Sequence, residues 1–388
     1  MYLQDSNKTY VFSMLYIHIP FCKQRCIYCD FYSTTLSPAF THSYVEAVEN
    51  EINDRYLEMP SQTLSSVYIG GGTPSLLPID AIHKLFKAIR SRFVLAHDAE
   101  ITFEVNPDDV NIQLIKVLKS EGVNRMSLGV QSFNDNQLQL LNRRHSSVQA
   151  VDAVNLIHQL GIQHINLDLI YGQPRQTLEM WTSDVRQALS LPIDHLSAYA
   201  LTVEESTKLQ HMLKKGIITM PSEDDTLSMY KILCQETKQR GFQHYEISNF
   251  SLPNAHSRHN CGYWQNKHYL GIGPGAHSYD GKTRKINPQN IHQYIASCGI
   301  INRQVEELTV NELCNDLIIT SLRTRQGLNL QTFYDNYGPQ RTDKLLTWAS
   351  PHIQRNSLVR EGHTLRLTEN GIFISNDIIS DLMFVDND

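Results

Sequence analysis

The chain has 388 residues, of which 41% are hydrophobic and 19% charged, so it can bury a substantial core and is not a disordered type of sequence. Its formal net charge is -6, which argues against nucleic-acid binding, although a local basic patch could bind an anionic ligand. No apolar run is long enough to cross a membrane, and residues 1–13 lack the features of a secretory signal. We expect a soluble, cytoplasmic protein with residues 1–13 as an N-terminal extension.

Short runs of β-branched and aromatic residues alternate with segments of helical periodicity, which is typical of a parallel α/β fold. In chain order the predicted strands cover residues 14–19, 66–69, 101–105, 125–130, 164–170 and 195–201, with a weaker one over 243–248. Gly122, Gly161 and Gly241 each follow a helical run and predict helix ends. These βα units are too few for a closed TIM barrel, so we predict a partial (β/α)6 TIM-like barrel within residues 14–300. Functional groups should lie at the carboxyl ends of its strands.

The pattern changes after about residue 300. Thr309 and Glu312 have the spacing of a capping box, which predicts the start of a helix. Residues 358–367 predict a β-hairpin with a turn at 361–363, and residues 369–383 predict a last helix. We therefore expect a small C-terminal helical, winged-helix-like domain over residues 301–388. Because its charge is mixed, we expect it to pack on the barrel rather than bind DNA.

The cysteines are unevenly distributed along the chain. Of seven, Cys22, Cys26 and Cys29 lie together directly after the first predicted strand, and the other four are scattered. This arrangement does not suit a disulfide framework and favours thiolate ligands in a reducing compartment. Three thiolates on one loop can hold three corners of a 4Fe-4S cubane and leave the fourth iron open to an external ligand. The alternatives are chance clustering and a zinc site, which would need a fourth Cys or His nearby. His18 is close in sequence, but on a strand that runs into the loop we expect it to pack or to support a ligand rather than to bind metal.

The segment around these cysteines carries a family resemblance. Residues 16–22, Tyr-Ile-His-Ile-Pro-Phe-Cys, with the spacing C-x-x-x-C-x-x-C, resemble the radical S-adenosylmethionine (SAM) superfamily. Within it, the chain is similar over nearly its whole length to the family of oxygen-independent coproporphyrinogen III oxidases. The resemblance implies a 4Fe-4S cluster on Cys22, Cys26 and Cys29, with SAM as a second cofactor and an electron donor as a partner.

A glycine run and several polar residues follow the next strands. Residues 70–74, Gly-Gly-Gly-Thr-Pro, would let the backbone approach a ligand, although such a run can also be a simple turn. Buried polar residues at strand ends need a partner, which is either a structural salt bridge or a ligand. In the family the matching carboxylates bind the ammonium and ribose hydroxyls of SAM, and the arginine binds its carboxylate. The SAM positions that the resemblance implies are Tyr16, Gly71, Gly72, Thr73, Glu104, Gln131, Arg143 and Asp168.

Two features distinguish activities within the family. The true oxidases have a further cysteine two residues after the third ligand, but this chain has Phe31 there, which argues against decarboxylase activity. Phe31 would instead pack on the adenine of SAM. Residues 259–264, His-Asn-Cys-Gly-Tyr-Trp, match the H-N-x-x-Y-W motif of the haem chaperone subgroup, HemW. The match implies His259 as an axial haem ligand and Tyr263 and Trp264 as haem contacts; the alternative is a packed loop that closes the barrel mouth.

The function predicted from these residues is that of a haem chaperone. It would bind haem as cargo and deliver it to haem-requiring respiratory proteins, dependent on a 4Fe-4S cluster and SAM. One alternative is oxygen-independent coproporphyrinogen III oxidase activity in porphyrin biosynthesis, and another is a radical SAM enzyme with a different substrate. No catalytic residue is assigned. A membrane-associated client and a homodimer are compatible with the sequence, and nucleic acid is not an expected partner.

Overall fold

The computed structural model describes residues 13–35 and 40–385. In this part of the chain, a mixed sheet has the strand order β12-β11-β10-β9-β1-β2-β3-β4-β5-β6-β8-β7. Its parallel middle consists of β1 (Ser13–Ile19), β2 (Thr63–Gly71), β3 (Val94–Val105), β4 (Arg125–Gln131), β5 (His164–Tyr171) and β6 (His195–Ala200). These are the six strands expected from the sequence. The expected N-terminal extension lies outside the described residues except for Ser13, which begins β1.

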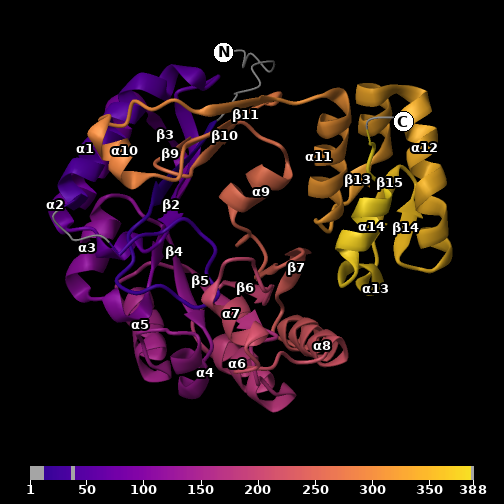
Figure 1. Cartoon of the computed structure of the whole chain (residues 1–388), viewed down its shortest axis with the longest axis horizontal. Helices are drawn as coiled ribbons and strands as arrows, with labels where there is room; N and C mark the ends of the chain where they lie inside the picture. The colour runs from indigo at the N-terminus through magenta and orange to yellow at the C-terminus, as the bar shows by residue number, and fades with distance from the viewer. Residues whose placement is uncertain (1–12, 36–39, 386–388) are drawn as a thin grey trace, which may run out of the picture.

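Helices follow the parallel strands and cover one face of the sheet (Figure 1). They are α1 (Thr41–Arg55), α2 (Ile79–Arg92), α3 (Ile112–Ser120), α4 (Asp135–Leu140), α5 (Ser147–Gln159), α6 (Leu178–Ser190) and α8 (Glu223–Gln239). The short helix α7 (Lys208–Lys214) instead packs against the loop after β1, where Leu209 contacts Ile27. Gly122, Gly161 and Gly241 follow α3, α5 and α8 with positive φ angles, which confirms them as helix-ending positions. Among the described residues, no helix is both long and apolar enough to span a membrane.

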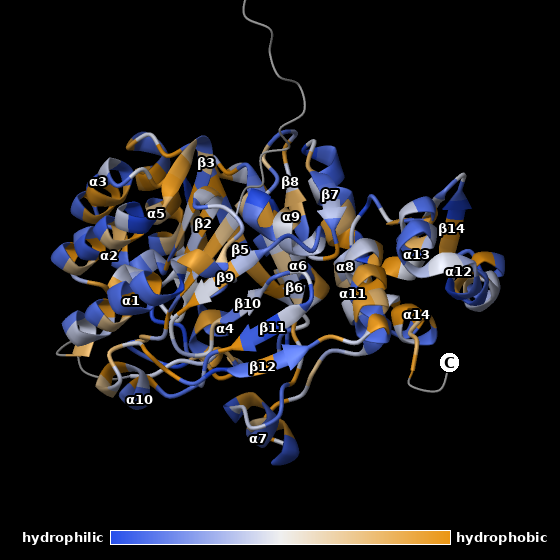
Figure 2. Cartoon of the chain, turned by 90° about the horizontal axis from the view of Figure 1, so that it is seen from above, coloured by the Kyte–Doolittle hydropathy of each residue, from blue (hydrophilic) through white to orange (hydrophobic). Residues whose placement is uncertain are grey.

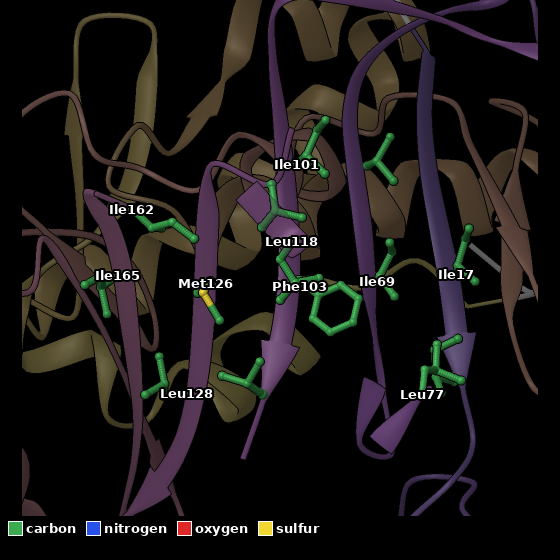
Figure 3. Packing of buried hydrophobic residues seen from close by; sticks show 14 of the residues in the cluster. Ile17, Ile69, Leu77, Ile101, Phe103, Leu118, Met126, Leu128, Ile162 and Ile165 are labelled. Carbon is green, nitrogen blue, oxygen red and sulfur yellow. The ribbon is translucent and has the colours of Figure 1, made fainter. Parts of the chain in front are cut away.

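The two faces of the parallel strands carry different side chains, because successive residues of a strand point to opposite sides. Ile17, Ile69, Phe103 and Met126 are fully buried, and Figure 3 shows them packed side by side with Leu118 of α3. The hydropathy colouring agrees, since the strands are largely apolar and the outer helix surfaces hydrophilic (Figure 2). The opposite face carries polar residues, and these line the inside of the curved sheet: Tyr16, Ser66, Tyr68, Glu104, Ser127 and Asp168.

Short strands that the sequence did not predict extend the sheet beyond β1. β9 (Tyr269–Ile272) runs parallel to β1, and β10 (His277–Tyr279), β11 (Thr283–Ile286) and β12 (Gln304–Glu307) continue antiparallel, with α10 (Ile291–Ala296) between the last two. Runs of three or four residues are too short to show a strand periodicity. At the other edge the strand expected over 243–248 is confirmed, although it ends two residues earlier and a second strand follows it. β7 (Gln243–Glu246) and β8 (Asn249–Ser251) form an antiparallel pair there, followed by α9 (Arg258–Trp264).

The C-terminal segment has a hydrophobic core of its own. Its elements are α11 (Val310–Leu322), β13 (Leu328–Asn329), α12 (Leu330–Gln354), β14 (Leu358–Glu361), β15 (Thr364–Leu367), α13 (Glu369–Ile372) and α14 (Ser375–Asp381). The capping box is confirmed, because Thr309 N donates to Glu312 Oε2 at 2.7 Å and Glu312 N donates to Thr309 Oγ1 at 3.3 Å. The β14–β15 hairpin is also confirmed, and β13 completes a three-stranded sheet.

The single last helix expected over 369–383 is wrong, because the chain breaks between α13 and α14 at Phe373 and Ile374. Ile372 and Phe373 pack against the core of the large sheet, whereas Ile378 and Leu382 lie in the C-terminal core. A continuous helix repeats its apolar face every 3.6 residues and presents one stripe. The break lets neighbouring apolar residues reach two separate cores.

Candidate functional site

The three clustered cysteines lie on the loop that follows β1. Backbone hydrogen bonds hold this loop, since Cys22 N donates to Thr34 O at 2.9 Å and Ile27 N donates to Leu141 O at 3.3 Å. All three thiols are free. The carboxyl end of β1 therefore presents them beside the ends of β2 to β5, where functional groups gather in such folds.

Side chains from other segments donate hydrogen bonds to two of the sulfurs. Thr73 Oγ1 lies 3.6 Å from Cys22 Sγ, and Arg143 Nη1 lies 3.4 Å from Cys26 Sγ. Asn106 connects the two donors, because its Nδ2 donates to Thr73 Oγ1 at 3.2 Å and its Oδ1 accepts from Arg143 Nη2 at 2.8 Å. Arg143 Nε is buried with no hydrogen-bond partner among the described residues, so one guanidinium donor is left for a ligand.

The electrostatics of this loop fit an anionic iron–sulfur cluster. Burial raises the pKa of the Cys22 thiol and raises that of Cys29 to about 11, so these two thiols need a metal or a positive charge to ionise. Burial alone would lower the pKa of Arg143, but the neighbouring Tyr28 and Cys26 raise this pKa by more than burial lowers it. The guanidinium therefore stays charged beside the sulfurs. N–H···S hydrogen bonds of this kind stabilise the negative charge of an iron–sulfur cluster. Three thiol donors and one cation thus suit a 4Fe-4S cluster.

The geometry gives no support to the zinc alternative. His18, the histidine nearest to the cysteines in sequence, is not free to be a fourth zinc ligand, because both of its ring nitrogens have other partners. Its Nε2 lies 2.8 Å from Tyr32 O, and its Nδ1 lies 2.9 Å from the hydroxyl of Tyr16. Burial also lowers the pKa of His18, so we interpret it as a neutral ring that orients Tyr16.

The glycine run is packed tightly against neighbouring strands. Gly71 has a φ angle of 110°, and a Cβ on it would lie 2.6 Å from the ring of His18. A Cβ on Gly72 would lie 2.7 Å from Phe21 O. Only glycine fits at both positions, because the first needs a positive φ and the second a close backbone approach. The backbone N–H of Gly71 donates to Glu104 Oε2 at 2.9 Å, so the run is part of the pocket wall rather than a free turn.

Two half-buried carboxyl groups, Glu104 and Asp168, lie on the inner face of the sheet. Glu104 accepts hydrogen bonds from Tyr68 at 2.6 Å and from Gly71 N, and Asp168 accepts from Asn166 Nδ2 at 2.7 Å. Burial raises the pKa of Glu104 to about 7 and that of Asp168 to about 6. Neither carboxylate forms a salt bridge with a Lys or Arg of the described chain. Two half-buried carboxylates without a salt-bridge partner favour a cationic or hydroxyl-rich ligand over a structural ion pair.

The remaining sequence-predicted SAM contacts lie at the same edge of the sheet. Gln131 ends β4 with a positive φ of 71° and is 9% exposed. Its backbone oxygen accepts from Gln173 Nε2 at 2.9 Å. Phe31, on the cysteine loop, is 65% exposed, so most of its surface is open to solvent. The structure therefore leaves Phe31 accessible to a ligand, and its contact with adenine stays a prediction.

Comparison with known proteins agrees with this geometry. The radical SAM superfamily model matches residues 16–188, and the HemN C-terminal domain model matches residues 308–374. A Lactococcus lactis protein named haem chaperone HemW is 34% identical over 380 residues, which cover 96% of this chain and 97% of that protein. The Bacillus subtilis haem chaperone HemW is 33% identical and covers 94% of this chain and 97% of its own length. The chain belongs to the HemW family of radical SAM proteins.

A solved structure confirms the fold of this HemW-family chain. Escherichia coli coproporphyrinogen III oxidase, HemN, which its description calls a radical SAM enzyme, superposes with a TM-score of 0.84 at 24% identity and covers 96% of this chain and 90% of that one. At this identity the likeness concerns the fold alone. Membership of the radical SAM superfamily implies the use of SAM and a 4Fe-4S cluster.

The segment that carries the HemW motif forms α9, and its histidine lies inside the curved sheet. His259 is 1% exposed. Its Nδ1 lies 2.8 Å from Ser66 Oγ of β2, and its Nε2 lies 2.9 Å from the hydroxyl of Tyr263. Burial lowers the pKa of His259 to about 3, so the ring is neutral. Iron could bind His259 only after one of these hydrogen bonds breaks, and its role as a haem ligand, with Tyr263 and Trp264 as haem contacts, stays a prediction.

This histidine is close to the SAM pocket implied by the HemW family, which sequence reasoning did not anticipate. The rings of His259 and Tyr68 are 5.2 Å apart, and Tyr68 donates to Glu104. One tyrosine therefore lies between the motif histidine and a carboxylate of the SAM pocket. Tyr68 could have been found from its position two residues before Gly70 on the same strand, since both share the inner face.

Proposed function

We propose that this chain binds haem and delivers it to haem-requiring proteins, respiratory proteins among them, with the help of a 4Fe-4S cluster and SAM. The supporting observation is the match along nearly the whole chain to proteins named haem chaperones. Phe31, in place of a cysteine, favours this function over decarboxylation. The seven free thiols suit the reducing cytoplasm. An electron donor for the cluster is a further expected partner.

Cys22, Cys26 and Cys29 would bind three irons of the cluster. When bound, such a cluster offers one iron without a protein ligand, which can hold SAM and pass it an electron. Thr73 and Arg143 would donate hydrogen bonds to the sulfurs, as they do in the structure. Glu104 and Asp168 would accept from the ammonium and ribose groups of SAM. Tyr16, Gly71, Gly72 and Gln131 would complete the pocket.

The raised pKa of Glu104 predicts that SAM binding depends on pH. A cationic ammonium binds the ionised carboxylate, so SAM affinity should fall as the pH drops from 8 through the pKa of Glu104 near 7, and further near 6 as Asp168 protonates. Glu104→Gln should weaken SAM binding at pH 8 by about tenfold and remove the step near pH 7. Equilibrium dialysis of the cluster-loaded protein would measure this. Glu179→Gln, an exposed change on α6, is the control, and equal affinities for Glu104→Gln and the wild type would refute the role.

The choice between chaperone and oxidase is tested on anaerobically reconstituted protein. Haem titration followed in the Soret region should show saturable binding, and incubation with coproporphyrinogen III and SAM should give no protoporphyrinogen. Transfer of the bound haem to an apo-haem protein should then follow. Formation of protoporphyrinogen would overturn the chaperone assignment in favour of the oxidase. SAM cleavage without substrate would not distinguish the two, because both need the same cluster.

A further inference from the structure

A large cavity lies between the sheet and the C-terminal segment, away from the cysteine loop. Its volume is about 690 Å³, which falls in the range of small-molecule sites. Figure 1 shows α8 and β7 on one side of this region and α13 on the other. Both sides are fixed to each other, because Ile247 N donates to Arg323 O at 2.9 Å and Arg325 N donates to Tyr245 O at 3.0 Å.

The lining combines apolar walls with positive charge. The apolar residues are Leu227, Phe242, Ile247, Leu322, Leu367 and Ile372. The cationic residues are Lys231, Lys238, Arg323, Arg325 and Arg366, against the two carboxyl groups of Glu246 and Glu369. In a chain with a net charge of -6, this local excess of cations favours a ligand that is both apolar and anionic.

Polar atoms of the lining lack partners within the described chain. Glu246 is 3% exposed, and its Oε1 has no hydrogen-bond partner. The Nε of Arg323 is also buried without a partner, although its Nη2 donates to Asn376. Unpartnered buried polar atoms are costly in a protein interior. A ligand with carboxylate groups could accept from Arg323 and, where Glu246 is protonated, from that carboxyl group.

A thiol and a phenol from α8 also line the cavity. Cys234 and Tyr230 are four residues apart on α8 and therefore lie on one helix face, from which both line the cavity. His244 of β7 stacks on Phe250 with ring centroids 4.2 Å apart, and its Nε2 contacts Ile247 O. Its ring is thus fixed as part of the wall. Cysteine thiolate is an established type of axial ligand for haem iron, and a hydrogen bond to the sulfur tunes it.

We propose that this cavity is the haem site of the chain, with Cys234 as the iron ligand and Arg323 and Arg325 as partners of the two propionates. The inference rests on the proposed haem-binding function and assigns its site. On binding, the Cys234 thiol releases its proton to solvent, and the sulfur forms a bond to ferric iron in place of a water ligand. No electron transfer is needed. Tyr230 donates to the bound sulfur, and the apolar walls cover the porphyrin faces.

The test uses full-length, cluster-loaded protein and two probes: ferric haem, and metal-free protoporphyrin IX, which keeps the propionates but has no iron. Cys234→Ser should weaken haem binding by about tenfold or more and move the Soret band, but leave protoporphyrin binding unchanged. The double variant Arg323→Gln/Arg325→Gln should weaken both probes without moving the Soret band. Cys298→Ser, an exposed thiol outside the cavity, should change neither.

The outcomes separate the site from the function. If the wild type binds haem but Cys234→Ser and the double arginine variant match it in affinity and Soret position, the cavity is not the site. A Soret shift in His259→Ala alone would then place the iron at α9. If the wild type binds no haem at all, the proposed function itself fails. Circular dichroism of each variant checks that the fold is retained.

Discussion

Replacing Cys22, Cys26 and Cys29 together with alanine is expected to reduce the iron and sulfide content of anaerobically reconstituted protein to background. Each thiolate supplies one of the three protein bonds of a 4Fe-4S cluster, and the described chain brings no other thiol to this loop that could replace them. The visible absorption of the cluster and its reduced electron paramagnetic resonance signal should disappear together. SAM binding should be lost as well, because the open iron is part of its site.

The matched control is Cys314→Ala or Cys298→Ala. Cys314 is buried in the C-terminal core and Cys298 is exposed, so both variants should keep a full complement of iron. Unaltered iron content in the triple variant would contradict the radical SAM assignment of the site. A lost cluster in Cys298→Ala would instead indicate general instability of the reconstituted protein.

The fold was predictable where the chain repeats long, regular units. Each parallel strand is followed by a helix, and this alternation is visible in sequence because strands and helices differ in period. The extension of the sheet by β9 to β12 was not predictable from the sequence. These strands are short, and the glycine-containing turns between them resemble loops. The break after Ile372 could not be predicted either. It depends on two cores on opposite sides of the segment, and sequence periodicity carries no information on where a second core lies.

The candidate site shows the same limit. Cys22, Glu104 and Asp168 were identified because their sequence motifs resemble those of the radical SAM family, and the expected strand order placed these motifs near one edge of a parallel sheet. Their supporting contacts were not identified, because Tyr68 and Asn106 act through side-chain hydrogen bonds that only the three-dimensional register brings together. For His259 the sequence motif predicted a haem ligand, which needs an accessible ring nitrogen. The fold instead buries this ring between β2 and Tyr263.

Arg125→Met is expected to destabilise the sheet strongly. Arg125 and Glu100 are 3% and 4% exposed, and Arg125 Nε donates to Glu100 Oε2 at 3.0 Å. The backbone N–H groups of Arg258 and His259, at the start of α9, donate to the same carboxylate. Removing one partner of a buried ion pair typically costs about 3–5 kcal/mol. Urea unfolding followed by circular dichroism should show this loss in the free energy of unfolding.

The same change should affect the site, because Glu100 anchors the α9 N-terminus and thereby the position of His259 beneath Tyr68. SAM affinity of the cluster-loaded Arg125→Met protein should therefore fall at temperatures where the protein is still folded. Arg258→Ala, a change on the same helix, removes an exposed ion pair with Asp98 and should leave both stability and SAM affinity nearly unchanged.

Glu100→Gln combined with Arg125→Met should recover part of the lost stability, since it removes the uncompensated buried charge. A urea midpoint of unfolding for Arg125→Met equal to that of the wild type would contradict this role of the ion pair in holding α9 against the sheet.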